Sequence, residues 1–372
     1  AMVLVDVALG RWSFQPAALK EYARRFLPLL AAMAVIFAAF VWLRLTVLGG
    51  RMSPDVYDSI FDLPMGRVGR LMTALQAWPI YARVLFFPRT LLADYGPRIL
   101  MPAFAWNGLA LLGLGIILFL LIGGIDALAS GRGRAALAFL WFPVTVLPVS
   151  NLLFPIGIIV AERTLYLPML ALCVGVALAL DQLATSPGTS PRLRRGLPLA
   201  LVALLAAGAA RSMVRIPQWD STDKIFYALR DDAPESFRAW WHLARIARRE
   251  NKAELEMRRY ETAMRLWPYR KALVYEVIAQ SIAHKRTGEA RNIAAFAVTR
   301  WPREVTPQRY LAATSLDLGD TATARTAARA GLAIAPTDSL LLAMASRVPG
   351  IRNPAPPPAG GRPAAASSGG AR

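Results

Sequence analysis

An acidic and a basic residue stand side by side between two apolar runs of the sequence. Glu162 and Arg163 lie in the segment FPIGIIVAERTLYLP, residues 154–168. A charge at the end of a membrane span is tolerated where it reaches water, a partner or a ligand. A planar guanidinium binds two phosphate oxygens at once, so Arg163 suits a phosphate ligand that Glu162 could help to orient. An equally open interpretation is that Arg163 only reaches for water and Glu162 is its ion-pair partner.

Three segments resemble one family of membrane enzymes. VAERTLYLP, at residues 160–168, is similar to the E-R-x-L-Y-x-P signature of the transmembrane and tetratricopeptide-repeat O-mannosyltransferases. PRTLLADYGPRILMP, at residues 88–102, resembles a second motif of the family, and residues 215–247 resemble its junction into the repeats. These proteins belong to the C-type glycosyltransferases, which use polyprenyl-phosphate sugars as donors. The resemblance covers most of residues 27–340 and implies a bacterial homologue.

The resemblance implies transfer of a sugar, mannose in the family, from a polyprenyl-phosphate donor to a protein acceptor presented by the repeats. No cofactor is expected besides the lipid-linked substrate. In the family the catalytic acidic residues lie in a first extracytoplasmic loop, before any segment matched here. The resemblance therefore implies an N-terminally truncated fragment whose catalytic residues are not assigned. Donor phosphate or sugar binding is expected from Arg163, Glu162, Tyr166, Asp94, Tyr95 and Arg89.

Composition is typical of a membrane protein with a water-exposed part. Hydrophobic residues make up 55% of the chain and the formal net charge is +19, with a mean hydropathy of +0.39. The excess of basic residues is not accompanied by a nucleic-acid-binding motif. It is more typical of loops beside membrane spans and of contact with anionic lipid. The single Cys173 allows no internal disulfide, and neither His242 nor His284 has neighbours at metal-ligand spacing.

Five apolar runs predict membrane spans within a helical domain covering residues 1–214. Two prolines and Arg83 interrupt a further run at residues 71–92, which is predicted to be re-entrant or interfacial. The basic loops around residues 132–134 and 192–195 are predicted to be cytoplasmic. This arrangement predicts a multi-pass protein of the bacterial inner membrane with a periplasmic C-terminal domain. The predicted spans are residues 27–48, 106–125, 135–153, 165–180 and 197–214.

The C-terminal part has an internal period. Pro234, Pro268, Pro302 and Pro336 recur at a spacing of 34 residues, the length of a tetratricopeptide repeat. The period predicts a domain at residues 215–348 with repeats at 237–270, 271–304 and 305–338. Residues 349–372, rich in Pro, Gly, Ala and Ser, are predicted to be disordered. The fold class is therefore all-α, a polytopic helical membrane domain followed by a tetratricopeptide-repeat α-solenoid.

The first helices of the repeats are predicted to line a polar and basic groove for an acceptor. Such a lining favours extended or acidic peptides over an apolar helix. Two other functions share this organisation, a non-catalytic membrane scaffold for envelope proteins and a polysaccharide ligase or polymerase. The predicted acceptor-binding residues are Arg238, His242, Arg245, Tyr275 and Arg309.

Overall fold

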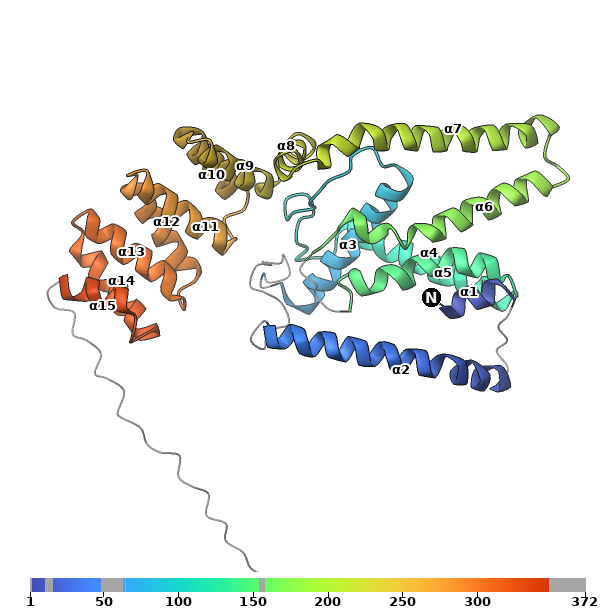
Figure 1. The fold of residues 1–372 in the computed structure, drawn as a ribbon, viewed down its shortest axis with the longest axis horizontal. Coiled ribbons are helices and arrows are strands. Elements are labelled where there is room, and N and C mark those ends of the chain that lie inside the picture. Colours follow the sequence, from blue (N-terminus) through green and yellow to red (C-terminus); the bar gives the residue numbers. More distant parts are fainter. Residues whose placement is uncertain (1, 11–15, 48–62, 64, 154–157, 348–372) are drawn as a thin grey trace, which may run out of the picture. The chain divides into compact units, whose positions relative to one another are not determined.

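A computed structural model describes residues 2–10, 16–47, 63, 65–153 and 158–347. Within those ranges all regular secondary structure is helical, and the chain forms two compact units, residues 1–246 and 247–372. The predicted all-α fold class is therefore confirmed (Figure 1). The predicted disordered tail at 349–372 lies outside the described residues.

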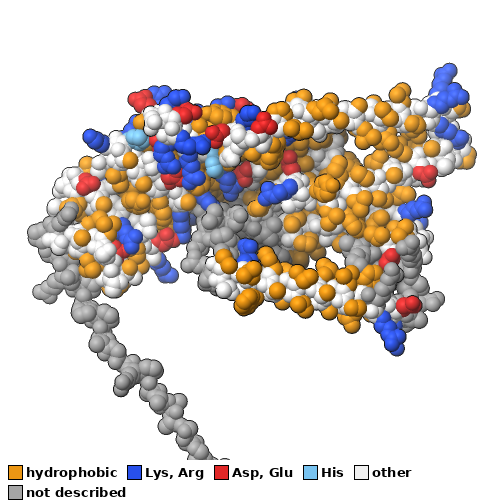
Figure 2. Space-filling view, viewed as in Figure 1, with side chains coloured by type: hydrophobic (Ala, Val, Ile, Leu, Met, Phe, Trp, Pro, Cys, Tyr) orange, Lys and Arg blue, Asp and Glu red, His pale blue; other side chains and the backbone are white. Residues whose placement is uncertain are grey.

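Long apolar helices dominate the first unit. Three are long and apolar enough to cross a membrane, at Phe26–Val47, Gly108–Ala129 and Pro191–Trp219, and two shorter apolar stretches cover Gly133–Val149 and Met169–Thr185. Many of their apolar side chains are exposed, as in Phe37 of the first long helix and Leu199 of the third, and Figure 2 shows apolar side chains spread along this unit. Such surfaces suit lipid better than water. The helices are α2 (Pro16–Val47), α4 (Gly108–Ala129), α5 (Gly133–Val146), α6 (Met169–Thr185) and α7 (Pro191–Arg215), after a short α1 (Met2–Ala8).

Close backbone contact joins α3 (Gly66–Phe86) to α4. A β-carbon added at Gly113 of α4 would lie 2.0 Å from the carbonyl oxygen of Leu75 in α3, so only glycine fits there. Small residues of this kind let membrane helices approach each other without a large apolar driving force. Trp78 of α3 packs edge-on against Phe142 of α5, with ring centroids 5.7 Å apart. These contacts form a core between α3, α4 and α5.

The segment predicted to be re-entrant or interfacial contains most of α3. The helix runs through Pro79 and ends at Phe86, and residues 87–107 then follow without regular helix. One face of α3 is buried, including Trp78 and Tyr81 at 1% exposure each. Burial in protein is the condition under which a partly polar segment is tolerated at membrane depth. Its position relative to a membrane stays a prediction.

Helix pairs with the predicted 34-residue period make up the second part of the chain. The turn between the two helices of each pair contains a residue with positive φ: Asn251 (56°), Lys285 (59°) and Gly319 (78°). These three positions are themselves 34 residues apart, so the same left-handed turn recurs in each repeat. The pairs are α9 (Phe237–Arg249) with α10 (Ala253–Leu266), α11 (Lys271–Ala283) with α12 (Thr287–Arg300), and α13 (Val305–Asp317) with α14 (Thr321–Ile334), followed by α15 (Ser339–Arg347).

The two units divide inside α9, between Ile246 and Ala247, whereas the sequence placed a domain boundary at residue 215. The first unit therefore includes the short helix η4 (Ile216–Trp219), α8 (Thr222–Asp232) and most of α9. The reason is a set of side-chain contacts, described below, between these elements and the segment that follows α3.

Candidate functional site

The carboxylate of Glu162 organises the candidate site. Glu162 begins the short helix η3 (Glu162–Leu165), and its Oε1 accepts hydrogen bonds from the backbone N–H of Leu92 and from the hydroxyl of Tyr95, at 2.9 Å. Leu92 and Tyr95 lie in the irregular segment after α3, which Pro88 and Pro97 keep from forming a helix. Two of the predicted donor-site motifs therefore meet at this carboxylate.

Burial changes the proton affinity of both groups. It raises the pKa of Glu162 above its ordinary 4.5, although the hydrogen bonds from Tyr95 and Leu92 and the positive charge of Arg215 act in the opposite direction. Burial and the adjacent carboxylate likewise raise the pKa of Tyr95, so this hydroxyl stays protonated as a hydrogen-bond donor. Perturbed carboxylates of this kind are enriched at functional sites.

Three polar side chains, two from helices and one from the segment after η2 (Leu147–Val149), hold the backbone around Glu162. The hydroxyl of Tyr81 in α3 donates to the carbonyl of Ile159 at 3.2 Å, and the amide of Asn151 donates to the carbonyl of Ile158 at 2.9 Å. The indole N–H of Trp141 in α5 donates to the carbonyl of Leu167 at 2.9 Å. The backbone on both sides of η3 is thereby fixed to the helical core.

Arg163 forms no ion pair with its acidic neighbour. Its side chain is exposed, and among the described residues it forms no hydrogen bond or ion pair. The interpretation that Glu162 is the ion-pair partner of Arg163 is therefore wrong, because Glu162 is occupied by Leu92 and Tyr95. Tyr166, one turn further on, is 88% exposed. An unpaired arginine and an exposed aromatic ring thus stand beside a carboxylate that is already engaged.

Asp94 was predicted to bind the donor and Arg238 to bind the acceptor, but the two side chains form an ion pair with each other. Nη1 of Arg238 lies 2.5 Å from Oδ1 of Asp94, and the two side chains are only 29% and 26% exposed. The other oxygen of Asp94, Oδ2, is buried and accepts no hydrogen bond from the described residues. The structure therefore joins the start of α9 to the segment after α3.

Two further arginines, which the sequence did not single out as site residues, bind the same segment. Nη2 of Arg215 donates to the carbonyl of Leu91 at 2.6 Å, and Nη2 of Arg211 donates to the carbonyl of Arg89 at 2.7 Å. The side chain of Arg89 itself is exposed. Arg215 lay within the motif matched at residues 215–247, and this motif was the signal that could have identified it.

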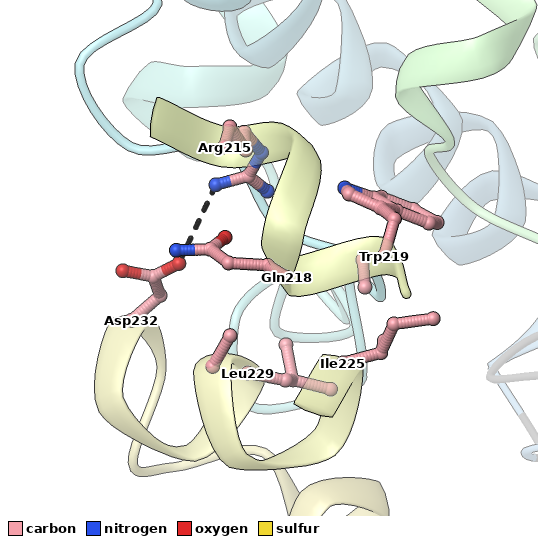
Figure 3. Close-up of a pocket in the computed structure, with 8 residues that line it drawn as sticks. Arg215, Gln218, Trp219, Ile225, Leu229 and Asp232 are labelled. Carbon is pink, nitrogen blue, oxygen red and sulfur yellow. Dashed lines mark ion pairs between the residues drawn. The ribbon is translucent and has the colours of Figure 1, made fainter. Parts of the chain in front are cut away.

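Arg215 also borders a small pocket. Its Nη1 lies 3.5 Å from Oδ2 of Asp232 in α8, and Figure 3 shows these two side chains on one side of the pocket together with Gln218 of η4, whose side chain is directed toward Asp232. Ala93, from the segment after α3, is part of the lining. The other lining residues are Trp219, Ile225, Ala228 and Leu229.

The predicted acceptor residues are each engaged within their own unit. In the first unit the ring of His242 stacks on Phe226 of α8, with centroids 3.6 Å apart, and Arg245 lies 4.5 Å above the ring of Trp241. In the second, Tyr275 donates to Glu304 at 2.9 Å and Nε of Arg309 donates to Asp338 at 2.6 Å. These contacts make structural contributions, and acceptor binding by these residues stays a prediction. Among the described residues no group of three His, Cys, Asp or Glu side chains is close enough to hold a metal.

Comparison with known proteins gives related sequences. No known family model matches the chain. Protein O-mannosyl-transferase TMTC1 of Mus musculus is 24% identical over 258 residues, which is 67% of this chain and 26% of the mouse protein. Protein O-mannosyl-transferase Tmtc2 of Drosophila melanogaster is 37% identical over 91 residues, 24% of this chain and 9% of the fly protein. The chain thus spans about a quarter or less of the length of these two relatives.

A solved structure, the P58(IPK) tetratricopeptide-repeat domain, is 12% identical and covers 76% of this chain and 78% of its own, with a TM-score of 0.27. That value is too low to support an argument about the fold, which rests on the helices described above. The sequence relatives are all protein O-mannosyl-transferases, in agreement with the three motifs. The chain therefore resembles the transmembrane and tetratricopeptide-repeat O-mannosyltransferases.

Proposed function

We propose that this chain is the donor-binding and acceptor-presenting part of a membrane glycosyltransferase. It takes a sugar, mannose by its relatives' activity, from a polyprenyl-phosphate donor and delivers it to a protein or peptide acceptor held by the repeats. The single observation that carries the proposal is the state of Arg163, which is exposed and unpaired among the described residues while Oε1 of Glu162 accepts from Leu92 and Tyr95. No residue of the chain is assigned as the catalytic base.

Arg163 suits the phosphate because of its position and its charge. It lies in η3, between the apolar helices α5 and α6, so a ligand beside it can keep its lipid chain against apolar side chains. The guanidinium binds phosphate oxygens in a bidentate way and stabilises the charge that grows on the departing phosphate. Exposed Tyr166 and Arg89 supply a sugar-stacking surface and a second cation. Glu162 and Tyr95 act by holding the backbone on either side.

The membrane setting follows from the apolar helices and the distribution of arginine. Basic residues gather at 132–134 and 192–195, next to apolar helices, and the positive-inside rule supports a cytoplasmic location for these loops. Glu162, Arg163 and the repeats then belong on the periplasmic side of a bacterial inner membrane. A donor phosphate at the outer surface and a repeat domain in the same compartment would meet there.

The test is sugar transfer by membrane vesicles containing the protein together with whatever its gene encodes on either side. Arg163→Lys should lower transfer about tenfold and Arg163→Gln about a hundredfold, because the ammonium lacks the planar fork and the amide lacks the charge. Arg192→Lys is the matched control, an exposed arginine beside another apolar helix, and should leave transfer unchanged. Right-side-out vesicles should modify added peptide, whereas inverted vesicles should not.

Equal transfer and equal donor affinity in wild type and in Arg163→Lys would exclude the phosphate role of Arg163. A protein that transfers no sugar to any peptide, but still retains envelope proteins through its repeats, would support the scaffold function. Elongation or ligation of a polysaccharide without peptide modification would support the ligase or polymerase function.

A further inference from the structure

The irregular segment of residues 89–95 is held from two directions. From one side Glu162 accepts from the N–H of Leu92 and from the hydroxyl of Tyr95. From the other side three arginines bind it: Arg211 at the carbonyl of residue 89, Arg215 at the carbonyl of residue 91 and Arg238 at the side chain of Asp94. We call residues 89–95 the donor loop. A loop with no regular secondary structure depends on such contacts for a fixed conformation.

Arg238 makes the only ion pair that the described side chains form with the donor loop. The pair is about three-quarters buried, so screening by water is limited and loss of one partner leaves a charge in an unfavourable place. Asp94 has one oxygen paired and one buried without a donor, so its carboxylate depends on Arg238 for compensation. A β-carbon at Gly96 would lie 3.2 Å from Oδ2, which shows how tightly the carboxylate is enclosed.

Arg215 reinforces this contact at the other end of the donor loop. Its side chain is 14% exposed and divides its donors between the carbonyl of Leu91 and the carboxylate of Asp232. Its positive charge also acts on Glu162, because it lowers the pKa of that carboxylate. Arg215 is therefore close to both sides of the loop, and the end of α7 and the start of α9 act on one short segment.

We propose that Arg238 and Arg215 are positioning residues of the donor side, which they serve by fixing the donor loop so that Tyr95 and Leu92 reach Glu162 beside Arg163. This inference rests on the proposed function. It assigns the start of α9, the first helix of the repeat array, to the donor side rather than to the acceptor groove, to which the sequence assigned Arg238. Arg238 acts through Asp94 and touches no substrate.

The experiment measures the loop and the reaction separately, in the protein with its native flanking sequence. Cys173 is replaced by serine, and Ala93, in the middle of the loop and half-buried, is replaced by cysteine. The rate of its reaction with a maleimide reports opening of the donor loop. Arg238→Asp should speed labelling about tenfold, and the exchanged pair Asp94→Arg with Arg238→Asp should return it towards the wild-type rate. Arg238→Lys, which keeps the charge, should fall in between.

Transfer kinetics supply the second measurement. Arg238→Asp should lower kcat/KM for the polyprenyl-phosphate sugar about tenfold with the KM for the acceptor peptide unchanged, and the exchanged pair should recover it. Arg215→Gln should act in the same direction. The matched control exchanges the exposed pair of Asp220 and Lys224, 2.8 Å apart with side chains 55% and 56% exposed, and should change neither labelling nor kinetics.

The labelling rate and the transfer kinetics can each contradict the inference. Unchanged labelling in Arg238→Asp overturns the inference whatever the activity. Faster labelling together with a raised KM for the peptide alone also overturns it, because Arg238 would then belong to the acceptor groove. If the wild type transfers no sugar, the proposed function fails, and with it the donor role, while labelling still shows whether Arg238 fixes the loop.

Discussion

Two buried or half-buried carboxylates, Glu162 in the first unit and Asp338 in the second, are shifted in opposite directions. Burial raises the pKa of Glu162 and its hydrogen bonds only partly compensate. Burial also acts to raise the pKa of Asp338, but the hydrogen bonds and charge of Arg309 and the N–H of Leu341 outweigh it and the pKa is lowered. Asp338 is thus a satisfied structural group, whereas Glu162 carries its charge at a cost.

The difference corresponds to two ways of using a carboxylate. Asp338 caps the N-terminus of α15, accepting from the N–H of Leu341 at 3.0 Å, and the same kind of cap occurs at Asp320 before α14. Glu162 instead holds a loop that is adjacent to an unpaired arginine. The carboxylate of the repeats is thus compensated by its partners, whereas the candidate site retains a carboxylate whose charge the fold does not fully compensate.

The largest effect is expected where the first unit is most closely packed. Gly113→Leu should destabilise that unit by about 3 kcal/mol, because the added side chain collides with the backbone of α3 at Leu75. Thermal unfolding in detergent should show a lower midpoint for the membrane part, while the transition of the repeats stays in place. Gly115→Leu, in the same helix with no atom within 4 Å of an added β-carbon, should have little effect. Equal midpoints for the two variants would contradict the close contact.

An intermediate effect is expected at Glu162. Glu162→Ala should destabilise the first unit by about 2 kcal/mol, since it leaves the N–H of Leu92 and the hydroxyl of Tyr95 without their acceptor. Because the folded pKa is raised, the contribution of the protonated carboxyl is present below pH 4.5 and is lost as the pH rises through the folded pKa. Glu162→Gln should therefore gain stability relative to wild type as the pH rises. If the stability of wild type and of Glu162→Gln changed in parallel with pH, the pKa of Glu162 would not be raised by folding.

The smallest effect, with the opposite pH dependence, is expected at Asp338. Asp338→Asn keeps a capping side chain but loses the pairing with Arg309, whose side chain is 43% exposed, so the cost should be about 1 kcal/mol. Because the folded pKa is lowered, this contribution is present above pH 3.8 and is lost as the pH falls through the folded pKa. Urea unfolding of the whole protein in detergent, followed through the transition of the second unit, measures it. Arg303→Gln, at an exposed position, is the control, and a cost independent of pH would refute the assignment.

The repeats were predictable because each structural requirement recurs in the sequence. The prolines fixed the period, and small residues on the second helix of a repeat, such as Ala290, Ala294 and Ala297, are fully buried. Trp240 is half-buried, and its indole donates to the carbonyl of Pro234 near the surface. The left-handed turn residues could have been found in the same way, from Asn251 and Gly319 at equivalent positions.

The site was predictable only in part. Its contacts join segments that are distant in the sequence, and they do not recur along the chain as the contacts of the repeats do. The motifs indicated Glu162, Arg163, Asp94 and Tyr95, but the spacing along the chain carried no information about which side chains would pair. The partner of Asp94 is 144 residues away, and Arg309 resembled Arg238 as a basic residue on a first helix. Only the fold distinguishes the arginine that binds a loop from the one that binds the residue capping α15.

The position of Arg238 has a consequence for building chimeric proteins. Repeat arrays are natural units for exchange between relatives, and the sequence would place the joint near residue 215. A joint there would separate the donor loop from Arg215 and Arg238, and the acquired repeats would have to supply both guanidinium groups. A joint after Ile246, where the two units divide, keeps these residues with the loop that they bind. Exchange of acceptor specificity should therefore be possible downstream of the first repeat helix and not upstream of it.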